Sequence, residues 1–504
     1  LKISTRMCFK KRAKAILLTW LFFYASWCSA LQSFSFNEQL LLAQSNILQF
    51  KLANAIKIIE QEERKNPNNL ASLYLKNHID FLELLMHQET GLVEKYEKKR
   101  NRKLELLEQI PESSPYHLFA KAQYYLQWAI IYAQHERFLN AAVNFRNAYH
   151  LLQTNSLKFP HFLPNKKELG LINVVLGSVP ENFKWVLNLT GFKGNSSEGL
   201  DWLKDVALGE VNPEQKIEKY FALFYLILSE LNYGNRELAW HYSVTELKDI
   251  NKSLLSVYVK SYVARKTGHT DEAISTIQKR PHGDEYTNTL LFDYELGVAK
   301  LQRLDYDADA YLKKFVSFYK GTELIKDAYK RLSWFYLIQQ NIEKYEIYKG
   351  LAQKYGASIS NEEKVALKED LPDYTPHPLL LKGRLLFDGG YYLRAEQIFK
   401  GIDKRTLINK YQQVEYPYRY ARVLHEEKKI SQAVDLYLEV IEKSKNNVYY
   451  FAPNSCLQLG YIHEKLGFVQ TALYYYRKVL TYKNYEYKLS ITQKAKAAIN
   501  RLDK

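Results

Sequence analysis

The chain has 504 residues, 47% of them hydrophobic and 14% aromatic, which is enough to bury two or three domain cores or one long solenoid and excludes a disordered chain. The formal net charge is +16, but the first 30 residues hold 6 cations and no Asp or Glu, which leaves a dispersed surplus of +10. Proteins that bind nucleic acids neutralise the phosphates with a cluster of Lys and Arg residues, and the dispersed surplus here is unlike such a cluster. We therefore expect no nucleic-acid partner.

Residues 1–30 have the order of a signal peptide. A basic stretch, Met7–Lys14, precedes the apolar Ala15–Tyr24 and small residues ending at Ala30. The apolar stretch is shorter than the roughly twenty residues of a membrane-spanning helix. We therefore expect export and cleavage after Ala30, with residues 1–6 as an upstream translation extension because Met7 is where a signal peptide would begin.

A second processing outcome stays open for the same leader. The residues before Cys28 resemble a poor lipoprotein box, in which Trp27 is unfavourable. Lipidation of Cys28, or a partner, would be the route to membrane association. Removal of the leader leaves Cys456 as the one remaining thiol, so the mature fold has no disulfide and depends on packing.

Residues 31–165 are predicted to be N-terminal helical repeats. A tetratricopeptide unit has about 34 residues in two antiparallel helices, with small residues where the helices approach closely. The first match places Ala43, Ala55, Ile59 and Pro67 at offsets 8, 20, 24 and 32. A second match spans residues 123–151, with anchors at Trp128, Ala129, Tyr132, Ala141, Phe145 and Ala148.

Residues 166–210 are predicted to form a non-repeat central element marked by glycines, which we expect at helix termini. Ser178-Val179-Pro180 and the run Gly191-Phe192-x-Gly194-Asn195-x-x-x-Gly199-Leu200 resemble the central element of the eukaryotic tetratricopeptide repeat 39 and inclusion-body-clearance family. The resemblance implies a helical adaptor without a catalytic centre, although that family has no export signal of this kind. A phosphate loop is not expected, because no Gly-Lys-Ser/Thr follows the glycines.

Residues 211–504 are predicted to be C-terminal tetratricopeptide-type repeats. Ala239 and Ala273 lie 34 residues apart, which is the repeat period. Further units have anchors at Gly297, Ala308, Leu312 and Phe315; at Gly383, Gly390, Ala395 and Phe399; at Ala421, Ala433 and Tyr437; and at Gly460, Gly467, Ala472 and Tyr476. A polar helix over residues 488–504 would cap the stack. The fold class is therefore all-α, a right-handed α-solenoid of tetratricopeptide-type helix-turn-helix repeats.

The C-terminal run Tyr485–Ala498 is similar to the ending of exported repeat proteins of Bacteroidota-like bacteria. That similarity implies a periplasmic or outer-membrane-associated location.

The sequence contains no motif of a metal site or of a catalytic centre. His-Glu-x-x-His, Cys-x-x-Cys and Gly-x-Ser-x-Gly are all absent, and His282–Glu285 has the Pro and Gly of a turn between repeats. We expect no cofactor, no metal and no enzymatic activity, and we expect Cys456 to be a small core residue.

Partner contacts are expected on the concave face. In proteins that this chain resembles, positions 2, 5, 9 and 12 of each first helix line the groove. The candidates in the last three units are His377, Leu380, Arg384 and Phe387; Glu415, Tyr418, Arg422 and His425; and Asn454, Leu457, Tyr461 and Glu464. The same residues could instead solvate the groove or pack against an extra helix. Their mixture of Arg, Tyr and Asn suits peptide recognition.

The sequence thus favours a non-catalytic scaffold or adaptor of the cell envelope that binds a protein or peptide through the concave face. The alternative is an envelope glycan-binding or uptake component, in the form of a lipoprotein. An enzyme with a helical support module is not expected, because no non-repeat stretch exceeds roughly fifty residues, too few for an ordinary domain.

Overall fold

A computed structural model describes residues 32–178, 194–321, 324–355, 375–444 and 449–502. The predicted leader lies outside these ranges. The described chain forms 24 α-helices and two short 3-10 helices, and its one extended pairing is an isolated bridge between Ser33 and Asn69. Within the same ranges, no helix is both long enough and apolar enough to cross a bilayer.

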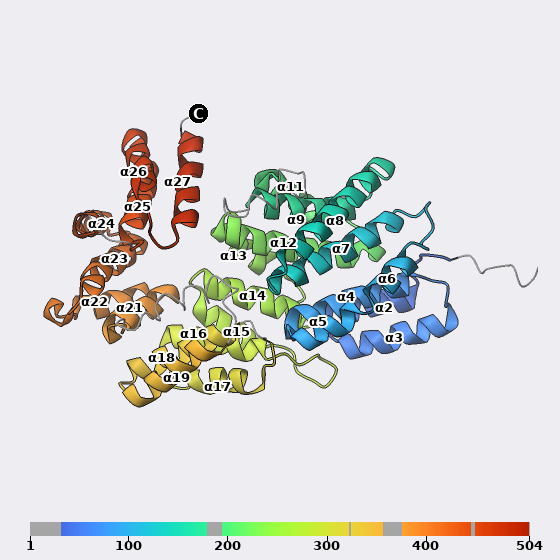
Figure 1. The fold of residues 1–504 in the computed structure, drawn as a ribbon, viewed down its shortest axis with the longest axis horizontal. Helices are drawn as coiled ribbons and strands as arrows, with labels where there is room; N and C mark the ends of the chain where they lie inside the picture. The colour runs from blue at the N-terminus through green and yellow to red at the C-terminus, as the bar shows by residue number, and fades with distance from the viewer. Residues whose placement is uncertain (1–31, 179–193, 322–323, 356–374, 445–448, 503–504) are drawn as a thin grey trace, which may run out of the picture.

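The helices of the N-terminal half pack in chain order as antiparallel neighbours (Figure 1). They are α2 (Glu38–Gln49) and α3 (Leu52–Lys65); α4 (Ala71–His87) with the short α5 (Thr90–Glu97) and α6 (Arg100–Leu107); α7 (Tyr116–Gln134) and α8 (Phe138–Lys158); α9 (Pro164–Gly177) and α11 (Ser196–Leu208); and, after the 3-10 turn η2 (Pro213–Gln215), α12 (Lys216–Tyr233) and α13 (Arg236–Thr245).

The C-terminal half continues the same hairpin pattern. Its helices are α14 (Leu254–Lys266) and α15 (Thr270–Gln278); α16 (Leu291–Arg303) and α17 (Ala308–Phe318); α18 (Ile325–Ile338) and α19 (Ile342–Lys354); α21 (Pro378–Asp388) and α22 (Tyr392–Lys400); the 3-10 turn η3 (Lys404–Thr406); α23 (Lys410–Glu426) and α24 (Ile430–Lys443); α25 (Phe451–Lys465) and α26 (Val469–Thr481); and the terminal α27 (Lys488–Leu502). The chain is an all-α, right-handed solenoid of tetratricopeptide-type hairpins, as its sequence predicts.

Most predicted anchors lie where two helices of a hairpin cross, whereas Pro67, Gly390 and Gly467 lie in the turns that follow a helix. The alanine anchors are buried, and Ala43, Ala129 and Ala433 have no exposed surface. At the glycine anchors the second helix supplies a large side chain: a Cβ on Gly297 would lie 2.7 Å from Cγ of Leu312, well inside van der Waals contact. These residues are small because the partner helix occupies the space that a larger side chain would need.

One hairpin, α18 with α19, was not predicted because it lacks the small-residue anchors. Its crossing is closed by aromatic side chains, with the rings of Tyr336 and Tyr348 stacked at 5.4 Å and an interplanar angle of 4°. Tyr345 is buried beside them. The stacked rings fill the space between the two helices. Because the expected pattern consists of small residues, it does not reveal this hairpin.

The described parts of the central element, residues 166–178 and 194–210, contribute α9 and α11, which cross closely. A Cβ on Gly170 would lie 2.9 Å from the carbonyl oxygen of Gly199, and one on Gly199 would lie 2.6 Å from that of Gly170. Gly199 is therefore a crossing residue inside α11, and not a helix terminus as the sequence suggested. Pro180, Gly191 and Phe192, which carry part of the family resemblance, lie outside the described residues.

The N-terminal hairpin also contacts helices far along the chain. Ser253 Oγ donates a 2.6 Å hydrogen bond to the carbonyl of Leu48, and the backbone N–H of Thr287 donates a 2.9 Å bond to the carbonyl of Phe50. Helix α2 packs against both α12 and α14. The first hairpin is therefore joined to the segments that precede α14 and α16 by contacts that span more than 200 residues of sequence.

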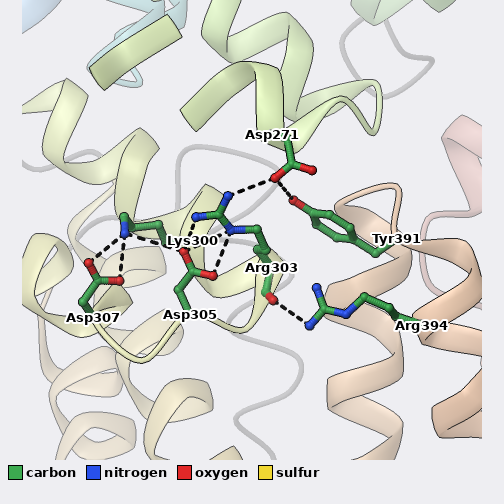
Figure 2. Close-up of polar contacts among 7 residues, drawn as sticks. All are labelled: Asp271, Lys300, Arg303, Asp305, Asp307, Tyr391 and Arg394. Carbon is green, nitrogen blue, oxygen red and sulfur yellow. Dashed lines mark hydrogen bonds and ion pairs between the residues drawn. The ribbon is translucent and has the colours of Figure 1, made fainter. Parts of the chain in front are cut away.

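The C-terminal helices α21–α27 form an arm on the left of Figure 1. Polar contacts attach the base of this arm to two earlier hairpins (Figure 2): Asp271 of α15 accepts 2.9 Å hydrogen bonds from Nη1 of Arg303 and from the hydroxyl of Tyr391, while Arg394 donates to the carbonyl of Arg303 at 3.0 Å. The turns at Gly268 and Gly390, with φ of +81° and +84°, press together so closely that a Cβ on Gly390 would collide with the carbonyl of Gly268.

We predict that Gly460→Ala destabilises the fold by about 1–3 kcal/mol, because the added Cβ would collide with the ring of Tyr476 and must displace it. The measurement is the free energy of urea unfolding. Gly350→Ala in α19 is the matched control: nothing lies within 4 Å of its added Cβ, so the better helix propensity of alanine should stabilise the protein by up to about 1 kcal/mol. Equal effects of the two changes would contradict the close helix approach.

Candidate partner-binding surface

The predicted concave-face residues lie on α21, α23 and α25, the first helices of three consecutive hairpins. Arg384, Phe387, Arg422, His425 and Asn454 are partly exposed, as are His377, Tyr461 and Glu464. These side chains are accessible at the surface of the C-terminal arm.

Four of the candidates belong to the core. Tyr418 is 2% exposed and packs 4.9 Å from the ring of Phe451, and Leu380, Glu415 and Leu457 are buried as well. The repeat offset placed Tyr418 on the groove, but α23 presents it to the next hairpin instead. A partner would not reach this side chain in the conformation described.

Arg422 and Phe387 form a contact between neighbouring hairpins. The guanidinium of Arg422 lies 5.1 Å from the centre of the Phe387 ring, a cation–π distance. The Phe387 ring in turn lies 5.5 Å from that of Tyr392 at the start of α22. The Nε of Arg422 is buried without a hydrogen-bond partner, so this guanidinium keeps an unused donor.

Other candidates already have partners within the fold. Glu464 accepts 2.6 Å hydrogen bonds from the hydroxyl of Tyr476 and from Nη2 of Arg501, and so ties α25 to α26 and α27. Arg384 lies 4.8 Å from the ring of Trp334 and 3.9 Å from Asp388. Burial lowers the pKa of His425, so this imidazole is neutral at pH 7.

Two further cations, Arg236 at the start of α13 and Lys494 of α27, are exposed at the surface. Desolvation by surrounding protein atoms and then the charge of Arg422 lower the pKa of Arg236, and desolvation followed by the charges of Arg236 and Arg422 lowers that of Lys494. We call Arg422, Phe387 and Tyr392, which contact one another, the arginine–aromatic cluster.

The repeat offsets included Arg422 and Phe387 among the groove candidates but not Tyr392, which completes their contact. Tyr392 begins α22, the second helix of its hairpin, whereas the offsets select only positions on first helices. Figure 1 shows α21, α22 and α23 next to one another in the arm.

The described ranges contain neither a metal-ligand cluster nor an accessible thiol. No group of three or more His, Cys, Asp and Glu side chains there could hold a metal ion. Cys456 has no exposed surface, and burial raises its thiol pKa to about 11. Its sulfur is therefore protonated and inaccessible at neutral pH, the properties of a core residue.

The most concentrated group of buried charges lies in the N-terminal half. Lys167 of α9 forms ion pairs with Glu168, at 2.6 Å, and with Glu218 of α12, and all three side chains are at most 1% exposed. Tyr74 of α4 donates a hydrogen bond to Glu218, and Nε2 of His78 lies 3.8 Å from the same carboxylate. The cluster thus joins α4, α9 and α12.

Mutual charge compensation favours the ionised forms of Lys167 and Glu218, whereas burial raises the pKa of Glu168. Burial by itself would lower the pKa of Lys167, but the two carboxylates raise it above its ordinary value. Burial would raise the pKa of Glu218, but Lys167 and His78 hold it below the ordinary value. Gln123 of α7 donates to Glu168 at 2.9 Å and to Glu218 at 3.2 Å. Because a substrate would have no access, we assign the cluster to the fold.

The described helices define a protein of the tetratricopeptide-like helical-repeat class. No family model and no curated protein matches the chain. Among solved structures, 61 chains match. One belongs to the structure of Naa15/Naa10 bound to HypK-THB, at 14% identity and a TM-score of 0.22, covering 92% of this chain and 72% of that chain. Because the two chains do not superpose globally at that score, the class rests on the hairpins of this chain itself.

The buried His78 predicts a specific loss of stability in acid. Burial lowers its pKa from 6.5 to about 4, so between these values the unfolded chain binds a proton that the folded chain does not. Stability attributable to His78 is therefore lost as the pH falls from 6.5 toward 4. We expect the wild type to lose about 1–2 kcal/mol more than His78→Gln between pH 7 and pH 5 in urea unfolding.

The matched control for this measurement is His150→Gln, which replaces an exposed histidine of α8. It should lose as much stability in acid as the wild type does. If His78→Gln also follows the wild-type curve, the imidazole is not held neutral by its surroundings.

Proposed function

We propose that this protein is a non-catalytic scaffold that holds a protein or peptide on the accessible face of its C-terminal arm. The observation that carries the proposal is the contact between Arg422 of α23, Phe387 of α21 and Tyr392 of α22, all three of which are partly exposed. Arginine and aromatic residues that lie together on an accessible surface are typical anchors of protein interfaces. Here they are supported by rigid, repeated hairpins.

A glycan-binding or uptake role is the second candidate. Exposed aromatic rings supply the observation that favours it: Phe468 and Tyr474, at the hairpin of α25 and α26, are 59% and 58% exposed. Sugar rings stack on such side chains. The protein-binding proposal is preferred because Arg422 and Phe387 combine an arginine with an aromatic ring in direct contact, the residue types typical of protein-interface anchors.

We further propose an envelope location, periplasmic or outer-membrane-associated, on the basis of the leader and the C-terminal similarity to exported repeat proteins. In this view the protein would be a bacterial relative of the tetratricopeptide repeat 39 and inclusion-body-clearance family, with its central element on α9 and α11. The resemblance supports an adaptor role.

Mass spectrometry of the purified mature protein tests the location. We expect an unmodified N-terminus at Leu31, produced by cleavage after Ala30. A mature chain that begins at a diacylated Cys28 would instead indicate a lipoprotein, and a chain that retains residues 7–30 would contradict export.

Loss of partner capture tests the scaffold role. We expect Arg422→Ala and Phe387→Ala each to reduce the yield of a crosslinked partner from the native envelope severalfold, because truncation of an interface anchor costs about 1–2 kcal/mol or more. Quantitative mass spectrometry of the crosslinked product is the measurement.

Arg405→Ala is the matched control, since Arg405 is exposed and pairs locally with Asp403. It should leave the yield unchanged. Equal yields from all three variants would mean that the partner binds elsewhere, and a crosslinked glycan in place of a protein would support the second candidate.

A further inference from the structure

Positive charge gathers at the C-terminal end of the arm. Residues 464–502, which form the end of α25 and the helices α26 and α27, contain 8 Lys or Arg and 2 Glu. One of these acids, Glu464, accepts a 2.6 Å hydrogen bond from Arg501, which places the end of α27 beside the end of α25 (Figure 1). More than half of the surplus of +10 outside the leader therefore lies here, so the charge is more concentrated than the composition of the whole chain indicates.

The turn between α25 and α26 presents apolar side chains to solvent at the same end. Leu466 is 55% exposed, Phe468 59% and Val469 38%, and Lys465 beside them is exposed as well. Gly467 in their midst has φ of +81° and nothing within 4 Å of an added Cβ, so the described chain leaves this turn uncovered. We call Leu466, Phe468 and Val469 the apolar turn.

The backbone of this turn forms a Schellman motif. The N–H of Phe468 donates to the carbonyl of His463 at 2.8 Å, and the N–H of Gly467 donates to that of Glu464 at 3.0 Å. A side chain at the position of Phe468 commonly packs on the last turn of the helix, and its ring does contact that of His463, with centroids 6.2 Å apart. That contact leaves more than half of the Phe468 side chain exposed.

The same turn in other hairpins has polar residues where this one has Leu466 and Phe468. Six other hairpins contain a residue with positive φ just after their first helix. The residues on either side of it are Gln49 and Lys51, His135 and Arg137, Thr267 and His269, Arg303 and Asp305, Gln339 and Asn341, and Glu427 and Lys429. The hairpin of α21 and α22 has Gly389 and Tyr391 there, and the hydroxyl of Tyr391 is bonded to Asp271. The repeat fold therefore does not require exposed apolar residues at this turn, and such a group marks a contact surface.

The exposed side of α26 extends this surface with aromatic rings and a cation. Tyr474 is 58% exposed, and Nζ of Lys478, one helical turn further on, lies 5.7 Å from the centre of its ring. Tyr475 contacts Tyr474 at 5.1 Å and stacks on His463 at 5.5 Å. Because His463 in turn contacts Phe468, the rings connect the apolar turn to Lys478 through direct contacts.

We propose that the apolar turn and the basic end of the arm bind the surface of a bilayer that contains anionic lipids. The three side chains of the apolar turn would enter the boundary between headgroups and acyl chains, and Tyr474 would lie at the level of the headgroups. Lys465, Lys478 and the cations of α27 would face the lipid phosphates. This contact goes beyond the proposed scaffold function, and it would hold the protein at a membrane without lipidation and without a partner.

Shape and charge favour a lipid surface over other occupants. Sites for small ligands are concave, and single-stranded nucleic acids lie in positively charged grooves, whereas this turn is uncovered and can approach a flat surface. A second copy of the chain would bring two positive ends together, and like charges across an interface repel. Apolar groups among cations match the two layers of an anionic bilayer, its charged surface and its apolar interior.

Flotation of the mature protein with lipid vesicles tests the proposal, with Cys28→Ser in every sample so that no lipid anchor contributes. We expect the protein to float with vesicles of phosphatidylcholine and phosphatidylglycerol, to float much less with phosphatidylcholine alone, and to be released by added salt. Phe468→Ser should weaken vesicle binding about tenfold through the lost apolar contact. Lys465→Gln and Lys478→Gln should each weaken it about fivefold, the typical contribution of one cation near an anionic surface.

Two matched variants change similar side chains elsewhere. Leu139→Ser replaces a leucine of α8 that is 65% exposed, and Lys410→Gln replaces an exposed lysine at the start of α23. Both should float like the wild type. Because none of the substituted side chains is buried, every variant should have the urea unfolding midpoint of the wild type, which separates lost binding from lost folding.

Equal flotation of Phe468→Ser and the wild type would overturn the proposal, as would equal binding to vesicles with and without phosphatidylglycerol. It would also be overturned if an anionic oligosaccharide or oligothymidylate prevented flotation and bound less tightly to Phe468→Ser, because the surface would then belong to a soluble ligand. Capture of the crosslinked partner through the arginine–aromatic cluster should be unchanged in Phe468→Ser, so the two proposals can fail separately.

Discussion

The close approach of two helices within each hairpin is the constraint on which the rest of the structure depends. Where the first helix has Gly or Ala, the second supplies a large side chain, as at Gly297 and Leu312 or at Gly383 and Phe399. A hairpin closed in this way buries little of its outer surface and must stack on its neighbours. Stacking of neighbouring hairpins in turn places Arg422 of α23 against Phe387 of α21.

The sequence predicted the features that repeat and missed those that occur once. The small anchors, the hairpins that contain them and the terminal helix α27 follow from local spacing. The hairpin of α18 and α19 was missed because stacked tyrosines replace its anchors. Tyr418 was placed on the surface because a repeat offset fixes the face of a helix only to within one position, and here the next hairpin covers that position.

Contacts between distant segments lie beyond any such spacing argument. Ser253 and Thr287 carry no motif, yet their bonds to Leu48 and Phe50 join segments more than 200 residues apart. The same holds for Lys167 and Glu218, whose buried ion pair links α9 to α12. A buried ion pair of this kind adds little net stability, but removal of one partner is strongly destabilising. The pair therefore favours the one arrangement of helices in which both charges are compensated.

The bonds between the first hairpin and the segments that precede α14 and α16 have a mechanical consequence. In an open solenoid each unit touches only its neighbours, so extension can separate the units one after another. Here the bonds from Ser253 to Leu48 and from Thr287 to Phe50 must break before α2 and α14 can move apart. The arm α21–α27 joins this part of the chain through the turns at Gly268 and Gly390 and the contacts of Asp271, so a force on a partner bound to the arm would act on this joint.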